Sequence, residues 1–417
     1  MKNFDLIVCG GGLSGVCASV SAAREGLSVL LIEKSGSLGG AINNNLVYPF
    51  MRYWEWTDEW KVERFLSDGL FTEIVDRQSK YEKPDSLMNF KPESVKKVLD
   101  DMIVESNVQV LFRSQVFDAQ TDGNKVKSIK VLTPSGVMDF SADYFIDATG
   151  NGDLIALTGC AFQLGRESDG LCQPMTTCFR LSGVDLSLMK KDYPRLQEEY
   201  KKAKLDGEIK NPRENILTMT GIGDGILHLN TTRVIKLNPT DAFDLSKAEI
   251  EARNQVFEIY KFLKSRSKAF ENSTIISVAS EIGIRESRKL KGKHILTVEE
   301  IKNCVSFEDT IAIGNYEIDI HNPAGSGTEL HYFKRGEYYQ IPYRSLVPNE
   351  YNNFLVAGRN LSATHEAHAA VRIMPICACL GQAAGTAVAL AKQSDSNTHD
   401  LDIKKLREKL LDNGASL

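Results

Sequence analysis

Three glycines near the N-terminus stand at the spacing of an anion-binding turn. Gly10, Gly12 and Gly15 fit the pattern G-x-G-x-x-G between a strand-forming run, residues 4–9, and an Ala/Ser/Val-rich run, residues 16–25, that favours a helix. At such a junction the glycines permit a sharp turn, close approach of the backbone to a diphosphate, and close packing of helix on strand. Free N–H groups at the start of the helix then bind the diphosphate. The spacing therefore predicts a dinucleotide site.

A carboxylate follows where dinucleotide binding requires one. Residues 27–32 form a second apolar run that ends at Glu33, eighteen residues after Gly15. Strand, glycine turn, helix and second strand make a βαβ unit, in which Glu33 is placed to accept hydrogen bonds from the adenosine ribose hydroxyls. An ordinary structural turn is the alternative for the glycines taken alone.

Histidines near the C-terminus are candidates for proton transfer. His365 and His368 lie in a loop between two segments expected to contact the cofactor, and His365 is the preferred general base. A surface or helix-capping role is the alternative for both. Tyr343 and Arg344 in "IPYRSL" are further pocket candidates.

Three arginines are candidates for binding an acidic group of a substrate. Arg285 and Arg288 lie in the run "GIRESRKLKG", and Arg372 follows the two histidines. A guanidinium group can bind a carboxylate through two parallel hydrogen bonds. For Arg285 and Arg288, an internal ion pair with Glu281 or Glu286 is the alternative.

The whole composition is that of an ordinary globular protein. The chain has 417 residues, 42% of them hydrophobic and 25% charged, with a net charge of −5. Two domains fit this length, and the mild acidity argues against a nucleic-acid or anionic-membrane partner. Eight cysteines show no zinc or disulfide spacing, so no metal site is expected. Because the chain passes directly into its first strand, a cytoplasmic location is expected.

One apolar stretch imitates a membrane span. Residues 374–391 consist mostly of Ala, Gly, Cys and Val, and Pro375 stands at a favoured first-turn position. A close-packed internal helix explains this composition better than a bilayer does, so no membrane insertion is expected.

The elements between these motifs follow from periodicity and turn signals. Residues 92–106 predict an amphipathic helix. Four strand-like runs then predict an antiparallel meander: 108–112, 115–119, 126–132 and 137–140. A further strand, residues 142–147, leads into Ala148-Thr149-Gly150, where small residues permit close approach of a ligand. Capping boxes predict helices opening at Ser246 and Thr297. The glycines of residues 221–225 precede a strand-like run, which argues against a second nucleotide site.

Four separated signals together resemble one family. They are "GGGLSG" with Glu33, "LGG" at 38–40, "DATGNGD" at 147–153, and "LVAGRNLSATHEAHAAVRIMP" followed by "GQAAG" at 355–385. The combination resembles FAD-dependent oxidoreductases of the glutathione-reductase-like superfamily, in the branch related to fumarate reductase flavoproteins. The resemblance implies an α/β fold: a Rossmann-like FAD-binding domain in three layers, with a parallel sheet and an antiparallel β-meander. Residues 1–159 and 350–417 would form this domain, and residues 160–349 an inserted α+β substrate domain.

The resemblance also assigns cofactor contacts position by position. It implies FAD held by Gly10, Gly12, Gly15, Glu33, Lys34, Gly39, Gly40, Val116, Thr149, Gly150, Asp153, Gly358, Arg359 and Pro375. Arg359 would neutralise phosphate charge, and the helix that begins at Pro375 would direct its positive end toward the flavin. Residues 43–45 are asparagines and offer no histidine for a covalent link, so FAD is expected to be non-covalent. A second G-x-G-x-x-G unit is missing from the sequence, so no NAD(P)H domain is expected.

The function implied is hydride transfer between a small organic substrate and flavin N5. His365 would be the base, and Arg285 and Arg372 would bind an anionic group. A hydroxy acid, a sugar or an unsaturated acid is compatible with these residues. Two alternatives remain: a flavoprotein with non-redox chemistry on a carbohydrate-like substrate, and a non-catalytic FAD-binding protein. The electron acceptor is left open, as is a homo-oligomer.

Overall fold

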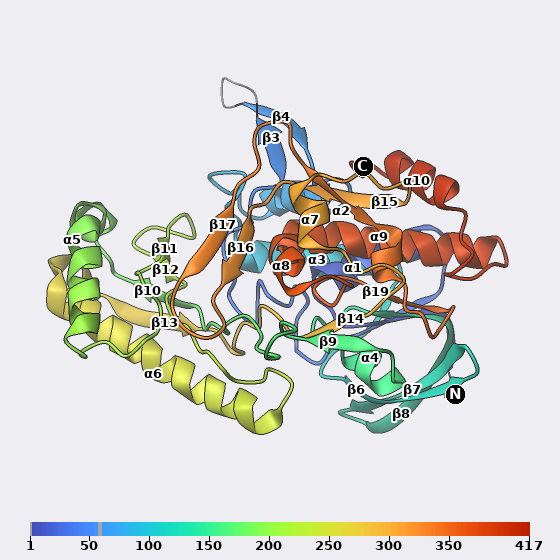
Figure 1. Cartoon of the computed structure of the whole chain (residues 1–417), viewed down its shortest axis with the longest axis horizontal. Coiled ribbons are helices and arrows are strands. Elements are labelled where there is room, and N and C mark those ends of the chain that lie inside the picture. The colour runs from blue at the N-terminus through green and yellow to red at the C-terminus, as the bar shows by residue number, and fades with distance from the viewer. Residues whose placement is uncertain (1, 57–60) are drawn as a thin grey trace.

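A seven-stranded sheet organises the larger part of the chain. The structure is a computed structural model that describes residues 2–56 and 61–417 (Figure 1). The strands of the main sheet are β1 (Lys2–Cys9), β2 (Val29–Ile32), β5 (Gln109–Leu111), β6 (Gln115–Asp122), β7 (Lys125–Thr133), β8 (Gly136–Asp147) and β19 (Phe354–Val356). Their order is β5-β2-β1-β8-β7-β6, and β19 also pairs with β8.

Strand β8 joins a parallel half of this sheet to an antiparallel half. Its residues from Phe140 to Asp147 pair in parallel with β1, and those from Phe145 to Asp147 pair in parallel with β19. Residues 136–141 of the same strand pair antiparallel with β7. The carboxyl ends of β1, β2, β8 and β19 therefore meet at one edge, which is where open α/β sheets bind ligands.

Two details of the predicted meander are wrong. The runs 137–140 and 142–147 are one 12-residue strand, because no turn residue interrupts them and Ser141 pairs with Ser128 on β7. The run 108–112 contains β5, which pairs in parallel with β2 and not with the next strand. The chain crosses from β5 to β6 through Ser114, whose N–H donates to the Glu33 carbonyl. The meander is thus β6-β7-β8.

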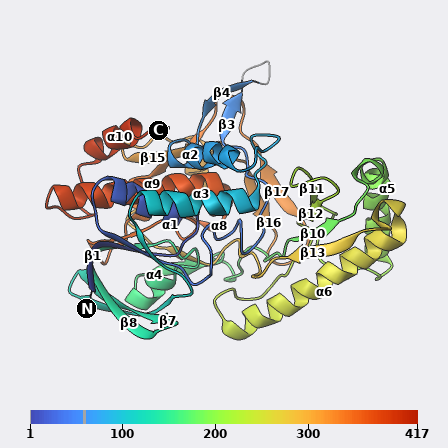
Figure 2. The ribbon, with the colours of Figure 1, turned by 180° about the vertical axis from the view of Figure 1, so that it is seen from behind.

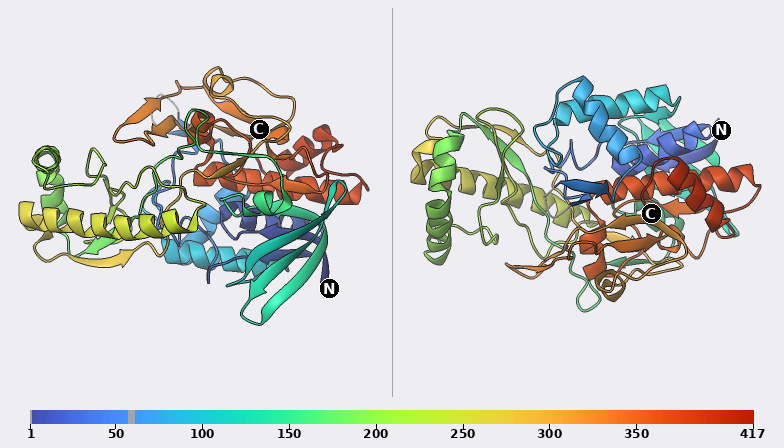
Figure 3. Two further views of the ribbon diagram at one scale, coloured as in Figure 1. Left: turned by 60° about the horizontal axis from the view of Figure 1, so that its bottom comes forward. Right: turned by 90° about the horizontal axis from the view of Figure 1, so that it is seen from above.

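Helices cover the parallel half on the side away from the meander. They are α1 (Leu13–Arg24), α2 (Leu70–Arg77) with the 3-10 turn η1 (Gln78–Lys80), α3 (Pro92–Glu105), α9 (Met374–Gln393) and α10 (Ile403–Asp412). Figure 2 shows α1, α3 and α9 side by side, and the left panel of Figure 3 shows the twisted meander beyond them. Helices, parallel sheet and meander form the three layers of the Rossmann-like α/β fold that the sequence predicts.

A lobe with its own hydrophobic core extends from this body (Figure 1). It has an antiparallel sheet in the order β11-β12-β10-β13, formed by β10 (Phe179–Ser182), β11 (Thr218–Met219), β12 (Leu227–Leu229) and β13 (Thr274–Val278). Its helices are α5 (Leu186–Leu205), α6 (Ala242–Arg266) and the 3-10 turn η2 (Lys268–Phe270). Leu181, Leu229 and Phe262 belong to its core.

The remaining described elements are short. The helices are α4 (Asp153–Thr158), α7 (Val298–Lys302), α8 (His365–Val371) and η3 (Tyr343–Leu346). The strands pair as β3 (Trp54–Trp56) with β4 (Val62–Phe65), β9 (Phe162–Leu164) with β14 (Arg288–Leu290), β15 (Thr310–Gly314) with β18 (Tyr339–Pro342), and β16 (Ile318–His321) with β17 (Thr328–His331). Leu290, Ile311 and Ile341 pack in the core of the main body. The domain limits at 159/160 and 349/350 stay a prediction.

The two predicted capping boxes have different outcomes. Thr297 accepts from the Glu300 N–H, and the Glu300 carboxylate accepts from the Thr297 N–H, so the box at the start of α7 is confirmed. The helix expected to open at Ser246 begins earlier, because Asp241 accepts hydrogen bonds from the N–H groups of Phe243 and Asp244. A carboxylate satisfies two free N–H groups there, which makes it a strong helix start.

Among the described residues, one helix, α9, is long and apolar enough to cross a membrane. Of its most apolar 18-residue stretch, 83% is buried inside the protein. It packs closely against α1 through two glycines. A Cβ at Gly381 would lie 2.1 Å from the Ser14 carbonyl oxygen, and one at Gly385 would lie 2.2 Å from that of Ala18. Only glycine permits this approach of the two backbones.

The close packing of α9 on α1 predicts that replacing Gly385 by alanine lowers the stability of the protein. Alanine favours a helix over glycine by about 1 kcal/mol. Gly385→Ala should nevertheless lower the free energy of unfolding, by about 1–3 kcal/mol, because the added methyl group overlaps α1. Urea denaturation measures the change, and Gln393→Ala on the exposed end of α9 is the control, expected to change stability by less than about 0.5 kcal/mol. A Gly385→Ala protein as stable as wild type would contradict the close packing.

Candidate functional site

The glycine turn connects β1 to α1 at the carboxyl edge of the sheet. Gly10 has φ +102°, and a Cβ there would lie 2.4 Å from the Ala148 carbonyl oxygen. A Cβ at Gly15 would lie 1.8 Å from the Gly10 carbonyl oxygen. At Gly12 a Cβ would meet no described atom within 4 Å, and no side chain caps the start of α1. The turn is thus packed on one side and open on the side where the helix N–H groups point.

Glu33 holds this turn from the end of β2. Its side chain is buried, its Oε2 accepts from the Gly11 N–H at 2.5 Å, and its Oε1 accepts from the Ser35 N–H at 2.7 Å. Each carboxylate oxygen can accept more than one hydrogen bond, so capacity remains for a ribose hydroxyl. The neighbouring Lys34 is half-exposed and pairs with Glu281 at 3.1 Å.

A cavity of about 290 Å³ opens beside the turn and brings many of the predicted residues together. Its lining includes Gly10, Gly12, Glu33, Lys34, Gly39, Gly40, Thr149, Gly150, Arg359 and Arg372. Two larger hollows, of about 560 and 840 Å³, lie elsewhere and contain none of these residues. The cavity is therefore the candidate site, and the contacts of its residues with a cofactor stay predictions.

The other predicted residues lie outside the lining. Gly15 packs α1 on β1, and Gly358, with φ +98°, passes close to Ser14. Pro375 follows Met374, which lines the cavity at the start of α9. Val116 lies on β6, and Asp153 begins α4 and pairs with Arg288 at 3.2 Å. His365 and Arg285 also lie outside the lining.

Arg359 is a partly buried cation for which the described residues provide no anionic partner. Its Nε donates to the Gly150 carbonyl at 2.8 Å, its Nη2 to Asn151 Oδ1 at 2.5 Å, and its Nη1 to the Ile284 carbonyl. Burial lowers the pKa of Arg359 to about 10, which leaves it charged at neutral pH. None of the described carboxylates forms an ion pair with it. A positive group that lines the cavity and is held by neutral acceptors suits a phosphate.

Asp147 fixes the segment that carries Thr149 and Gly150. Its Oδ1 accepts from the N–H and the hydroxyl of Thr149, and its Oδ2 accepts from the Ile155 N–H at 2.8 Å. Burial, with a smaller contribution from Asp153, raises the pKa of Asp147 to about 6 despite these hydrogen bonds. The sequence motif "DATGNGD" contained this residue but gave it no role.

Arg372 and Arg285 lie close together beside the cavity. Arg372 contacts Gln173 Oε1 at 3.4 Å, lies 3.9 Å from Asp319, and has an Nε without a hydrogen-bond partner among the described residues. Arg285 donates to the Pro174 carbonyl at 2.6 Å and to the Thr176 hydroxyl. Burial and the charge of Arg372 lower the pKa of Arg285 to about 9. Arg372 thus has one long ion pair, with Asp319, and Arg285 forms none with the described carboxylates.

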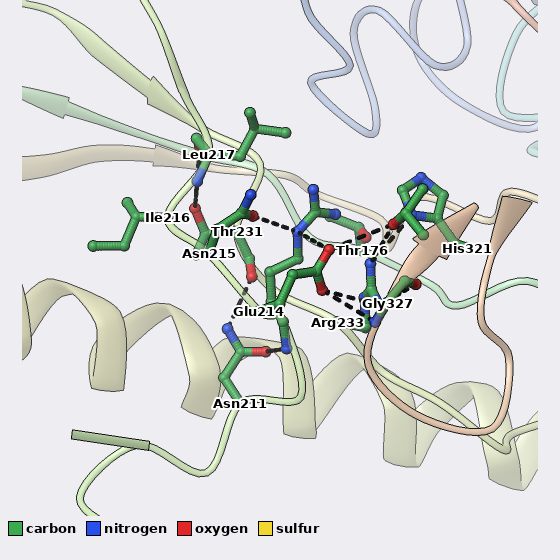
Figure 4. A network of polar contacts seen from close by, with 12 residues as sticks. Thr176, Asn211, Glu214, Asn215, Ile216, Leu217, Thr231, Arg233, His321 and Gly327 are labelled. Atoms are coloured by element: carbon green, nitrogen blue, oxygen red, sulfur yellow. Dashed lines mark hydrogen bonds and ion pairs between the residues drawn. The ribbon is translucent and has the colours of Figure 1, made fainter. Parts of the chain in front are cut away.

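A further polar network contains Arg233, Glu214 and His321 (Figure 4). Arg233 lies 3.2 Å from Glu214 Oε2, and 3.2 Å from His321 Nδ1. His321 Nε2 in turn lies 3.2 Å from Asp319. Burial and Arg285 lower the pKa of His321 to about 3, so it is neutral at neutral pH.

The charges of this network do not cancel. Four arginines act on one another here, and two carboxylates accompany them: Arg213, Arg233, Arg285 and Arg372, with Glu214 and Asp319. Arginines thus outnumber the carboxylates that act on Arg285 and Arg233, which favours an anionic ligand. The sequence identified Arg285 and Arg372. It missed Arg213, Arg233 and Asp319, because no motif connects segments so far apart along the chain.

His365 belongs to a second buried cluster. Its Nδ1 lies 2.7 Å from Glu286 Oε2 without the alignment of a hydrogen bond, and its Nε2 has no partner in the described part of the chain. Glu286 also pairs with the fully buried Lys289, and it accepts from the Gln173 N–H at 3.0 Å. Burial acts to raise the pKa of Glu286, but His365 and Lys289 outweigh it and lower the pKa to about 2.

Several alternatives from the sequence are resolved by these contacts. The ion pairs considered for Arg285 and Arg288 with Glu281 or Glu286 do not form between these described residues. His368 is buried and its Nε2 lies 2.7 Å from the Arg359 carbonyl, which fits a structural role. Tyr343 and Arg344 line the hollow beside α10, where Arg344 pairs with Asp309. They are therefore not part of the cavity beside the glycine turn.

Because the space beside Gly12 is open, a larger side chain at this position tests FAD binding without disturbing the fold. Gly12 has φ −68°, which any residue can adopt, so Gly12→Val should fold normally. The new side chain occupies the space beside the helix N–H groups, and we expect the Kd for FAD to rise at least about tenfold, the equivalent of about 1.4 kcal/mol. Fluorescence titration of the apoprotein with FAD measures it. Gly36→Val, on the loop after β2 and outside the cavity, is the control; equal FAD affinity in both variants would contradict the assignment.

The buried Glu286–Lys289 pair predicts a strong effect on stability. Glu286→Gln leaves Lys289 charged and unpaired, and we expect the free energy of unfolding at pH 7 to fall by about 3–5 kcal/mol. Replacing both residues by methionine should recover most of this loss. Because the pKa of Glu286 is lowered on folding, the stabilisation is present above about pH 4.5 and declines as the pH falls toward 2. Denaturation of both variants at pH 7 and pH 4 tests the coupling, which a double variant no better than Glu286→Gln would refute.

Comparison with solved structures finds full-length matches at low identity. A geranylgeranyl bacteriochlorophyll reductase-like protein from Thermoplasma acidophilum is 13% identical with a TM-score of 0.48, over 98% of this chain and 83% of its own. The p-nitrophenol 4-monooxygenase of Pseudomonas putida DLL-E4 is 10% identical with a TM-score of 0.49, over 98% of this chain and 84% of its own.

Comparison with curated proteins and with family models gives the family. Dihydrolipoamide dehydrogenase of Chaetomium thermophilum is 48% identical over 40 residues, which are 10% of this chain and only 8% of that protein. Residues 5–410 match the family model described as FAD dependent oxidoreductase. Because this match spans nearly the whole chain, the protein belongs to the FAD dependent oxidoreductase family and is an enzyme with FAD as its cofactor.

Proposed function

We propose that this enzyme oxidises a small organic anion by removing a hydride and a proton from it. The observation that carries the proposal is Arg372 in the lining of the cavity, with its Nε unpaired among the described residues and with further arginines beside it. A substrate carboxylate would supply the missing negative charge. A hydroxy acid fits this requirement better than a neutral sugar does.

The glycine turn, Glu33 and Arg359 are proposed to hold FAD without a covalent bond. The open face of Gly12 and the unpaired charge of Arg359 support this placement, since both suit a diphosphate. When bound, FAD supplies a hydride acceptor. The same arrangement is compatible with a place in the glutathione-reductase-like superfamily, near the fumarate reductase flavoproteins, and we propose that relationship as well.

The chain's own residues are proposed to orient the substrate and accept its proton. Arg372 would bind the carboxylate through Nε and a neighbouring Nη, since Nε has no other described partner. Asp319 and Gln173 both contact Nη2 of this guanidinium group and limit its motion. His365 would act as the base, because its Nε2 is unpaired while Glu286 lies against Nδ1 and stabilises the protonated ring.

The visible spectrum of the FAD-loaded protein tests the proposal. Under anaerobic conditions, a hydroxy acid should bleach the absorbance near about 450 nm that belongs to oxidised FAD, whereas neutral sugars should not. Turnover without bleaching would favour non-redox chemistry. A protein whose FAD none of the acids reduces would contradict the proposed oxidation.

Substitution of Arg372 separates binding of the anion from the reaction itself. Arg372→Gln should raise KM for the acid about 10- to 100-fold, as expected for loss of a charged hydrogen-bonding group. Arg372→Lys keeps the charge but cannot form the bidentate contact with the carboxylate. We therefore expect its KM to lie between those of wild type and Arg372→Gln. Steady-state kinetics measure both variants against Arg195→Gln on the exposed surface of α5. An unchanged KM in Arg372→Gln would place the anion elsewhere.

A further inference from the structure

A second group of unpaired polar side chains lies on the lobe, apart from the cavity and the arginine network. Arg180 on β10 has buried Nε and Nη2 atoms without a hydrogen-bond partner among the described residues. His228 on β12 is completely buried, and both of its ring nitrogens lack a partner in the same part of the chain. Asn230 has an unpaired, buried Oδ1. None of these residues has a role in the reaction proposed above.

The pairing of the lobe strands brings these groups onto one face. Arg180 lies directly opposite His228 in the antiparallel ladder, so their Cβ atoms are about 5 Å apart on the same side of the sheet. The ladder continues to Asn230, whose N–H donates to the Leu217 carbonyl at 3.0 Å, and Asn230 lies two residues beyond His228. Residues two apart along a strand share a face. The opposite face carries Phe179 and Leu229, which fill the core of the lobe.

The main body covers this polar face. The Tyr48 ring lies 5.5 Å from the His228 ring, and its hydroxyl donates to the Thr220 carbonyl at 3.2 Å. Lys91 Nζ donates to the carbonyls of Gly221 and Ile222 at 3.1 and 2.9 Å. The glycine-rich segment 221–225, which has no nucleotide-binding context, is thus attached to the body beside this face. His228 is enclosed between lobe and body, while Arg180 and Asn230 are partly buried and have their unpaired atoms inside.

Buried polar atoms without hydrogen-bond partners lower the stability of the protein unless a ligand forms hydrogen bonds with them. A buried polar group without a partner loses its hydration and gains nothing in return, and a buried charge loses more. Natural structures contain few groups of this kind, and several on one face call for an explanation. Burial and the charge of Arg180 lower the pKa of His228 to about 3, so the ring is neutral and offers one donor and one acceptor.

The unpaired atoms define the chemistry of the ligand. Nε and Nη2 form one edge of the guanidinium group and match the two oxygens of a carboxylate. The acceptor nitrogen of His228 and the Oδ1 of Asn230 need donors, which a carboxylate lacks and a hydroxyl provides. We propose that Arg180, His228 and Asn230 form a binding site for a hydroxylated carboxylic acid, with the acid group on Arg180 and hydroxyl groups on His228 and Asn230.

This site is close to the cavity but shares no residue with it. Leu46 follows Asn45, which lines the cavity, and it packs with Cys178, two residues before Arg180, and with Ala279. The proposal does not rest on the reaction proposed above, because binding at Arg180 is measured without turnover. A single substrate long enough to reach both positions would link the two sites.

Isothermal titration calorimetry on the FAD-loaded Arg372→Gln protein, in which the proposed anion contact of the cavity is removed, tests the site with a matched series of acids. Gluconate, glycerate, lactate and propionate carry a carboxylate with a decreasing number of hydroxyls, and glycerol carries hydroxyls alone. We expect the affinity to decrease along the series and glycerol not to bind. In this background, Arg180→Met and His228→Leu should each weaken binding of the best acid at least tenfold, whereas Arg195→Met on α5 should leave it unchanged.

Thermal unfolding without acid separates a ligand site from a structural role. If the unpaired groups serve a ligand, Arg180→Met and His228→Leu should unfold at the same temperature as wild type or higher, because each removes unsatisfied buried atoms. Lower unfolding temperatures in both variants would indicate a structural role and overturn the proposal. It would equally be overturned if the Arg372→Gln protein bound none of the four acids, or if neither Arg180→Met nor His228→Leu weakened the binding.

Discussion

The close approach of three backbone segments is the constraint on which the rest of this structure depends. Gly10 and Gly15 let β1, α1 and the end of β8 meet at distances that no side chain permits, and Gly381 and Gly385 do the same for α1 and α9. These contacts place the N-terminus of α1 at the carboxyl edge of the sheet. The helix N–H groups, Glu33 and Arg359 can then face one cavity because the packing behind them is rigid and fully buried.

Positive charge without matching negative charge is the second constraint. Arg359, Arg372 and Arg285 lie in or beside the cavity, and their hydrogen bonds go mainly to carbonyl, amide and hydroxyl oxygens. Neutral acceptors keep Arg359 and Arg285 in position without cancelling their charge, and Arg372 has a carboxylate, Asp319, only at 3.9 Å. A protein that needed only stability would pair these groups with carboxylates, as it does for Lys289 and Glu286 in the same region. The contrast between these arginines and the paired Lys289 indicates that an anionic ligand binds at the arginines.

Local patterns predicted the parts of the fold that local interactions determine. The glycine turn, Glu33, α3 and the capping box at Thr297 each depend on residues close together in sequence. The joining of two predicted strands into β8 and the pairing of β5 with β2 depend on partners far along the chain. The arginine network and the face of Arg180 and His228 also consist of residues far apart along the chain. No rule based on sequence spacing could therefore predict them.

The lobe shows how one small sheet can serve both packing and binding. Alternation along β10 and β12 directs Phe179 and Leu229 into the lobe core, and it directs Arg180 and His228 toward the body. The apolar face supplies the burial that keeps the sheet folded, so the polar face is free to retain groups that reduce stability. Unsatisfied atoms can persist there because the sheet beneath them is held by its other side. Packing and binding are also divided between two sides at the glycine turn. One side of the turn is tightly packed, and the other is open to a ligand.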